Sequence, residues 1–123
     1  MGYRSEVVIV MRKKDYNTMK KRALVLKNKS MIEIIEKAET YTAGPKETLR
    51  IIRWNWIKWY PEYPEIKWIE KFLNDKDYIF YRIGEDISDV VEVCSGEYED
   101  LWDCAYLDRS VVIEGNLILN KEE

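Results

Sequence analysis

The chain has 123 residues, of which 46% are hydrophobic and 35% charged, a composition typical of a globular protein with one core. It contains no histidine, which excludes Ser-His and Cys-His nucleophile pairs and any metal site that depends on histidine. No apolar run approaches the roughly 18 residues that a membrane-spanning helix needs. The amino terminus carries no recognisable secretion signal, so we expect a cytoplasmic protein whose two cysteines, Cys94 and Cys104, stay reduced.

The net charge of −3 conceals a strong asymmetry along the chain. Residues 1–60 contain 14 Lys or Arg and 6 Asp or Glu, whereas residues 61–123 contain 6 and 17. Either the two halves attract each other, within the chain or between subunits, or a basic face meets an anionic ligand. Both interpretations remain open at this point.

The first third of the chain predicts one strand and two helices. Residues 3–11 (YRSEVVIVM) alternate and then become fully apolar, which is typical of a central strand. Asp15 can cap a first helix, which has an apolar face: Tyr16, Met19, Ala23 and Leu26. Ser30 and Glu33 form a capping box for a second helix, and Ala43-Gly44-Pro45 marks the end of this region.

Residues 48–60 (TLRIIRWNWIKWY) are rich in β-branched and aromatic side chains and predict a strand that Pro61 ends. Strict alternation along this strand would place Trp54 and Trp56 on one face and Trp59 on the other. A single stacking platform could therefore not include all three indoles. Most of these rings are expected to belong to the core or to a subunit interface.

Pro64 suits the first turn of a third helix that continues to about Asn74. Short strands are then predicted near residues 78–83, 90–94, 101–106 and 110–114. The order β-α-α-β-α followed by strands predicts an α+β fold, a single layer of helices packed on a mainly antiparallel β-sheet. We expect one domain over residues 1–119 and a frayed polar tail at residues 120–123.

Common enzyme motifs such as G-x-x-x-x-G-K-[ST], G-x-S-x-G and C-x-x-C are absent from the sequence. Acidic residues gather between positions 85 and 108: Glu85, Asp86, Asp89, Glu92, Glu97, Glu99, Asp100, Asp103 and Asp108. They could form a solvated acidic face or a surface that mimics nucleic acid and blocks a DNA-binding partner. Two of them could also serve a metal-dependent hydrolase as a general acid/base pair.

Some arginines lie beside aromatic or apolar segments. Arg53 precedes Trp54, Arg82 follows Phe80 closely, and Arg109 stands just before a predicted strand. A nucleotide needs a flat apolar surface for its base, where stacking contributes about 1–3 kcal/mol, and fixed donors for its phosphates. Each arginine could equally form a surface ion pair.

Three stretches together resemble a family of small phage proteins: MGYRSEV at residues 1–7, LRIIRWNWIKWYPEYPEIKWIEKFL at 49–73 and YIFYRIGED at 78–86. Members of this family open with M-G-Y-R-S and carry W-x-W-x-K-W-Y followed by E-Y-P. Within the family, the chain is similar to the first type of phage Thoeris anti-defence protein. The resemblance covers roughly residues 1–115.

This resemblance implies a sponge that acts in the cytoplasm of an infected bacterium. Such a protein binds the cyclic ADP-ribose signal that a TIR-domain enzyme makes from NAD, does not cleave it, and keeps it from the Thoeris effector. The family forms homodimers that assemble further, with a pocket near the subunit interface where aromatic rings stack on adenine and arginines bind phosphates. Related sponges also bind cyclic oligonucleotide signals at separate sites.

Under this interpretation we expect Arg109 to contact phosphate, because it stands alone in an acidic stretch beside a strand. Phe80 and Arg82, alternate residues on one strand face, are the next candidates. The remaining expected ligand-binding residues are Trp54, Tyr3, Arg4 and Asp108. No catalytic residue, metal, cofactor, membrane or nucleic acid is expected. The rival hypothesis is an acidic interaction protein that blocks a host nucleic-acid-binding protein.

Overall fold

The computed structural model describes residues 3–86, 88–97, 101, 105–107 and 111–117. Arg109, Asp108, Cys104 and the tail at 120–123 lie outside these residues. The centre of the molecule is a six-stranded sheet in the order β5-β4-β1-β3-β2-β8, and each neighbouring pair is antiparallel. Its strands are β1 (Ser5–Arg12), β2 (Glu39–Ala43), β3 (Leu49–Ile57), β4 (Tyr78–Gly84), β5 (Val90–Ser95) and β8 (Asn116–Leu117).

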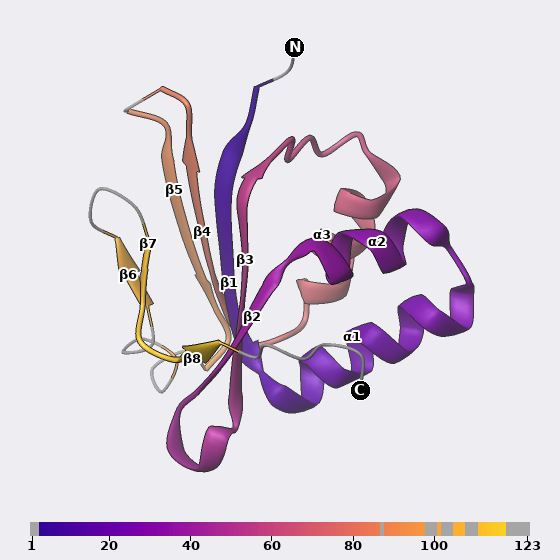
Figure 1. Ribbon diagram of the computed structural model, residues 1–123, viewed down its shortest axis with the longest axis horizontal. Helices are drawn as coiled ribbons and strands as arrows, with labels where there is room; N and C mark the ends of the chain where they lie inside the picture. The colour runs from indigo at the N-terminus through magenta and orange to yellow at the C-terminus, as the bar shows by residue number, and fades with distance from the viewer. Residues whose placement is uncertain (1–2, 87, 98–100, 102–104, 108–110, 118–123) are drawn as a thin grey trace.

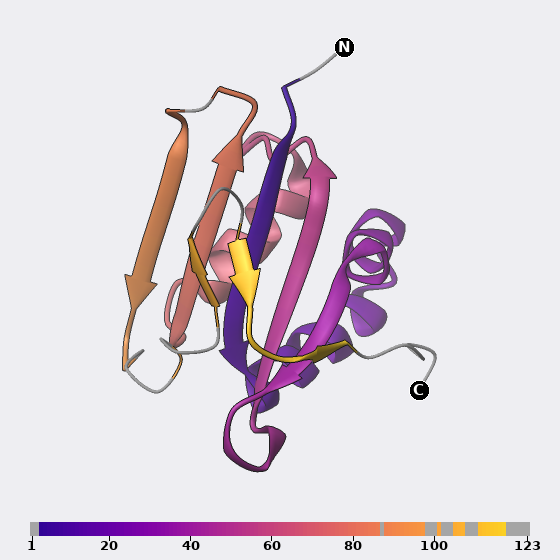
Figure 2. The same cartoon turned by 60° about the vertical axis from the view of Figure 1, so that its left-hand side comes forward.

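Helices cover one face of this sheet (Figure 1): α1 (Lys13–Leu26), α2 (Lys29–Lys37) and α3 (Pro64–Leu73). A small hairpin of β6 (Ala105–Leu107) and β7 (Val111–Ile113) lies over the other face (Figure 2). A short 3-10 turn, η1 (Pro45–Glu47), connects β2 to β3. The predicted α+β fold, with one layer of helices on an antiparallel sheet, is confirmed. None of the described helices is both long and apolar enough to cross a lipid bilayer.

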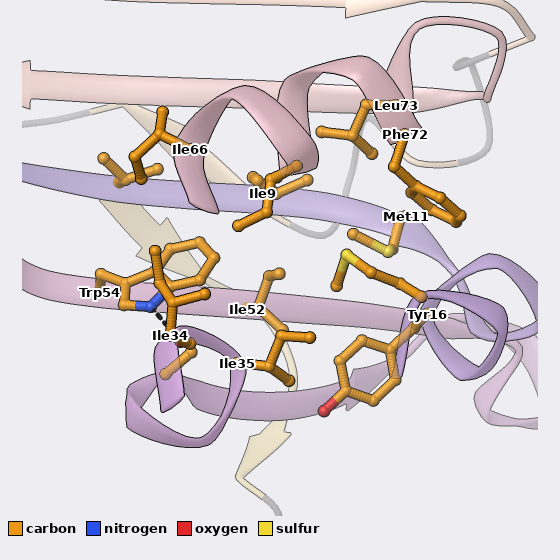
Figure 3. Packing of buried hydrophobic residues seen from close by; sticks show 14 of the residues in the cluster. Ile9, Met11, Tyr16, Ile34, Ile35, Ile52, Trp54, Ile66, Phe72 and Leu73 are labelled. Atoms are coloured by element: carbon orange, nitrogen blue, oxygen red, sulfur yellow. Dashed lines mark hydrogen bonds between the residues drawn. The ribbon is translucent and has the colours of Figure 1, made fainter. Parts of the chain in front are cut away.

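The apolar run in β1 reflects burial on both faces of the sheet. Val7, Ile9 and Met11 contact the helical layer, whereas Val8 and Val10 face the hairpin side. Strands that are buried on both sides are expected to read as continuous apolar runs. Figure 3 shows the helical side, where residues of β1 and β3 meet side chains from all three helices.

The predicted helix caps were wrong. Asp15 lies inside the first turn of α1, and the N–H of Lys13 at the helix start is instead bonded to the backbone carbonyl of Thr48 at 2.8 Å. Helix α2 starts before the predicted capping box: the side chain of Asn28 accepts from the N–H of Met31 at 3.2 Å. Ser30 is therefore within the helix rather than at its cap.

The predicted face of Trp59 was also wrong. Ser5 pairs with Ile57 and Val7 pairs with Trp54, so β3 has one extra residue opposite β1, which is a β-bulge. The strand then ends at Ile57. Trp54 and Trp59 consequently lie on the same side of the sheet, with ring centroids 5.2 Å apart, while Trp56 is 57% exposed.

Two strands and one exposed residue were not foreseen from the sequence. Strand β2 extends the sheet beyond β3, with Tyr41 opposite Ile51, and the two-residue β8 pairs with β2. Leu26 was expected on the buried face of α1 but is exposed, although Tyr16, Met19 and Ala23 are buried as predicted. The last turn of α1 therefore extends beyond the core.

Candidate functional site

Among the described residues, two of the clefts on the helical side of the sheet contain expected ligand-binding residues, and both are bordered by α3. The first, which we call the aromatic cleft, has a volume of about 560 Å³. The second, the basic cleft, has a volume of about 430 Å³. Tyr3 and Tyr60 line the aromatic cleft, whereas Arg4 and Tyr63 line the basic cleft. The two linings therefore meet near the start of β1 and the loop after β3. Both volumes fall within the usual range for small-molecule sites, about 300–1,000 Å³.

The aromatic cleft takes its apolar wall from β4, β5, α3 and the loop after β3. Tyr78, Phe80 and Arg82 reach it because alternate residues of a strand share one face. The rings of Phe80 and Trp59 are largely buried, with centroids 5.9 Å apart. Tyr60 and Tyr78 are only partly buried, so they offer more accessible ring surface than Phe80 does.

A polar cluster forms the rim of the aromatic cleft. Asp89 accepts from both terminal nitrogens of Arg82, Nη1 at 3.0 Å and Nη2 at 2.9 Å. The hydroxyl of Tyr3 donates to the same carboxylate at 2.7 Å and accepts from the N–H of Asp86 at 3.0 Å. These bonds, first from Arg82 and then from Tyr3, hold the pKa of Asp89 below its usual range.

The guanidinium of Arg82 retains donors for a ligand. Nη1 also approaches the hydroxyl of Ser5 at 3.3 Å, which occupies both of its protons. The Nε–H and the second Nη2–H have no acceptor among the described residues. These two groups form the side edge of the guanidinium fork, the edge that binds oxyanions in bidentate fashion.

Trp59 contributes a buried donor that lacks an acceptor. The side chain is 7% exposed, and its Nε1–H has no hydrogen-bond partner among the described residues. An unpaired buried polar group costs about 1–3 kcal/mol. The Nε1 atom itself is buried, so a ligand in the cleft could reach it only if the wall moved.

The basic cleft has a different chemical character. Arg4, Lys37 and Lys58 border it, and none of their side chains forms an ion pair within the described part of the chain. The exposed indole of Trp56 lies at the same cleft. Trp54 also reaches it, but this residue is buried, and its Nε1–H donates to the carbonyl of Ile34 at 2.7 Å (Figure 3). Trp54 thus has a structural role as well.

The expected ligand-binding residues divide between the clefts. Tyr3, Phe80 and Arg82 line the aromatic cleft, and Arg4 and Trp54 line the basic cleft. Arg109 and Asp108 are outside the described residues. Sequence reasoning missed several lining residues: Trp59, Tyr60, Tyr78 and Asp89. Only Tyr78 had a usable signal, because it alternates with Phe80 and Arg82 along the same strand.

No protein-family model, curated protein or solved structure matches the chain. Within the described residues, no group of three or more acidic or cysteine side chains could hold a metal ion. Of the two clefts, the aromatic cleft is the one that combines ring surface with a preorganised arginine fork.

Proposed function

We propose that the protein binds and sequesters a cyclic ADP-ribose signal made by a TIR-domain enzyme, and thereby inhibits Thoeris defence in the cytoplasm of an infected bacterium. The observation that supports this best is the convergence of Tyr3, Phe80 and Arg82 in one cleft. These residues come from distant parts of the chain, and all three were expected to bind the ligand. The identity of the signal rests on the family resemblance.

The aromatic cleft suits the two chemical parts of such a ligand. An adenine ring can pack against the partly buried rings of Tyr60 and Tyr78, and base stacking contributes about 1–3 kcal/mol. The free edge of Arg82 can hold a phosphate while Asp89 keeps the guanidinium in place. The binding is non-covalent in this proposal, and the signal is released intact.

One copy of the cleft is poor in positive charge for a pyrophosphate. Arg82 is its one cation among the described lining residues, and the carboxylates of Asp89 and Glu70 border it as well. Capture at nanomolar affinity requires about −12 kcal/mol, which is hard to gather in one open cleft. We therefore include a homo-oligomer in the proposal, with a second subunit that completes the site.

The decisive experiment is a capture and release assay. The purified protein is incubated with the product of the TIR enzyme, separated from free ligand and heated, and the supernatant is tested for effector activation. Intact signal in the supernatant supports sequestration. A new reaction product would indicate an enzyme, and absence of any bound nucleotide would reject the proposal.

The acidic rim favours a second candidate function. Glu85, Asp86, Asp89 and Glu92 lie in or next to the hairpin of β4 and β5, and rows of carboxylates can imitate nucleic-acid phosphates. In that case the protein would block a host nucleic-acid-binding protein. Capture of one such partner, with no small molecule released on heating, would favour this alternative.

A further inference from the structure

Tyr3 forms hydrogen bonds to two separate parts of the aromatic cleft. Its N–H donates to the hydroxyl of Tyr60 at 2.6 Å, in the loop after β3. Its own hydroxyl donates to Asp89 at 2.7 Å and accepts from the N–H of Asp86 at 3.0 Å, between β4 and β5. We call Tyr3 and its neighbour Arg4 the strap.

The strap lies where the sheet topology brings these two parts close together. Strand β1 lies between β4 and β3 and is antiparallel to both, so Ser5 at its start is opposite the last residue of each (Figure 1). The N–H of Arg4 adds a further bond to the turn after β4, to the carboxylate of Glu85 at 2.8 Å. The strap therefore joins two sides of one cleft that belong to strands which are not neighbours in the sheet.

The strap lies outside the paired part of β1. The pairing with β3 and with β4 begins at Ser5, and Tyr3 is 38% exposed and belongs to neither hydrophobic cluster of the core. Exposed hydrogen bonds make a small net contribution to stability because water competes for the same groups. The strap can therefore be released while the core stays folded.

Gly84 provides the space in which the strap meets the hairpin of β4 and β5. A Cβ atom at this position would collide with the hydroxyl of Tyr3 and with the carboxylate of Asp89. Gly84 does not have a positive φ, so close approach is the reason that a glycine is needed here. Any side chain at this position would push the strap away from the turn.

We propose that Tyr3 is a positioning residue that holds the two sides of the aromatic cleft together and slows the release of a bound ligand. Through Asp89, it also restrains the carboxylate that orients Arg82. A site that is already held in its binding geometry loses less freedom when the ligand binds. Differences of this kind appear mainly in the dissociation rate. The effect on a ligand rests on the proposed function, whereas the strap itself does not.

The first test breaks the strap at either end. Tyr3→Phe removes the hydroxyl that bonds the hairpin, Tyr60→Phe removes the acceptor of the Tyr3 N–H, and both variants retain their aromatic rings. In surface plasmon resonance, each should raise the dissociation rate constant of the TIR product about 3–10-fold, the factor for one or two net hydrogen bonds. Tyr41→Phe is the matched control, because its hydroxyl bonds Glu39 outside both clefts, and it should release the ligand as the wild type does.

The double variant distinguishes a strap from two independent contacts. Two links in series are broken by the loss of either, so Tyr3→Phe combined with Tyr60→Phe should release the ligand no faster than the faster single variant. Gly84→Ala, which displaces the strap by collision, should also speed release, and adding Tyr3→Phe to it should have no further effect.

A second test needs no ligand. The N–H of Gly84 donates to the carbonyl of Asp89 at 2.8 Å, within the turn that the strap holds. In hydrogen exchange followed by NMR, this amide should exchange about 2–10-fold faster in Tyr3→Phe and in Tyr60→Phe than in the wild type. The exchange rate in Tyr41→Phe should equal that of the wild type.

The two tests separate failure of the strap from failure of the proposed function. If the wild type binds the TIR product but Tyr3→Phe releases it at the wild-type rate, or if the two single effects multiply in the double variant, the strap is overturned and sequestration stands. If the wild type binds no TIR product, the proposed function fails and hydrogen exchange decides alone. An unchanged exchange rate of the Gly84 amide in Tyr3→Phe would then overturn the strap as well.

Discussion

Asp89 holds the guanidinium of Arg82 from its end, with Oδ2 3.0 Å from Nη1 and Oδ1 2.9 Å from Nη2. Arg82 lies on β4, and Asp89 immediately precedes β5, so the hairpin itself brings them together. Tyr3 donates to the same carboxylate and ties the beginning of the chain to this hairpin. The ion pair therefore orients the side edge of the guanidinium without occupying it.

This arrangement predicts that shape matters at position 82 as much as charge. Arg82→Lys retains the positive charge but loses the bidentate fork, so we expect the affinity for the TIR product to fall about 10–100-fold, the range for charge-assisted hydrogen bonds. Isothermal titration calorimetry measures this loss. Arg50→Lys, which lies outside both clefts, is the matched control and should bind normally. Normal binding by Arg82→Lys would remove Arg82 from the site.

The two buried tryptophans should respond differently to loss of their N–H. Trp54→Phe leaves the carbonyl of Ile34 without its 2.7 Å donor near the end of α2, which adds about 1–3 kcal/mol to the cost of the smaller ring. Trp59→Phe removes a donor that has no acceptor among the described residues. We expect Trp54→Phe to reduce the free energy of unfolding in urea by at least about 1 kcal/mol more than Trp59→Phe. Equal losses would contradict this.

The start of α2 offers a test of the observed cap. Asn28→Ala removes the side chain that accepts from Met31 and should lower the free energy of unfolding by about 0.5–2 kcal/mol. Ser30→Ala changes an exposed residue inside the helix and should stay within about 0.5 kcal/mol of the wild type. Urea denaturation of both variants distinguishes the two positions. A larger loss of unfolding free energy for Ser30→Ala than for Asn28→Ala would instead support the capping box of Ser30 and Glu33.

Glu6 should make a pH-dependent contribution to stability. Burial raises the pKa of this carboxyl group above its ordinary value, although the Val111 N–H and Arg53 act against the shift. The folded state thus binds the proton more tightly than the unfolded state, and stability falls as pH rises through the raised pKa. Relative to Glu6→Gln, the wild type should lose free energy of unfolding as the pH rises above about 4.3, the ordinary Glu value.

Asp77 provides a control of opposite sign. The N–H of Glu97 and the guanidinium of Arg12 both bond its carboxylate and lower its pKa. Relative to Asp77→Asn, the wild type should therefore lose stability as the pH falls below about 4, the ordinary Asp range. Thermal unfolding of the wild type, Glu6→Gln and Asp77→Asn between pH 3 and 7 measures both effects. If the stability difference between the wild type and each variant changed with pH in the same direction for Glu6 and Asp77, the opposite pKa shifts assigned to them would be contradicted.

The elements that sequence reasoning predicted well are those with strong local signals. The apolar run of β1, Pro64 at the first turn of α3 and the alternation of β4 each depend on neighbouring residues alone. Strand β2 was missed because ETYTA is short and half polar, and it becomes a strand through its pairing with β3. Leu26 was misplaced because helical periodicity does not reveal where the underlying core ends.

By itself the sequence determined the α+β class, the absence of histidine chemistry and the shared strand face of Phe80 and Arg82. Tertiary structure decided which residues join them. A single extra residue in β3 and the end of that strand at Ile57 put Trp59 beside Trp54, in the wall of the aromatic cleft. Asp89 reaches Arg82 because a hairpin closes. Contacts of this kind depend on register and on distant pairings, which local patterns along the chain do not encode.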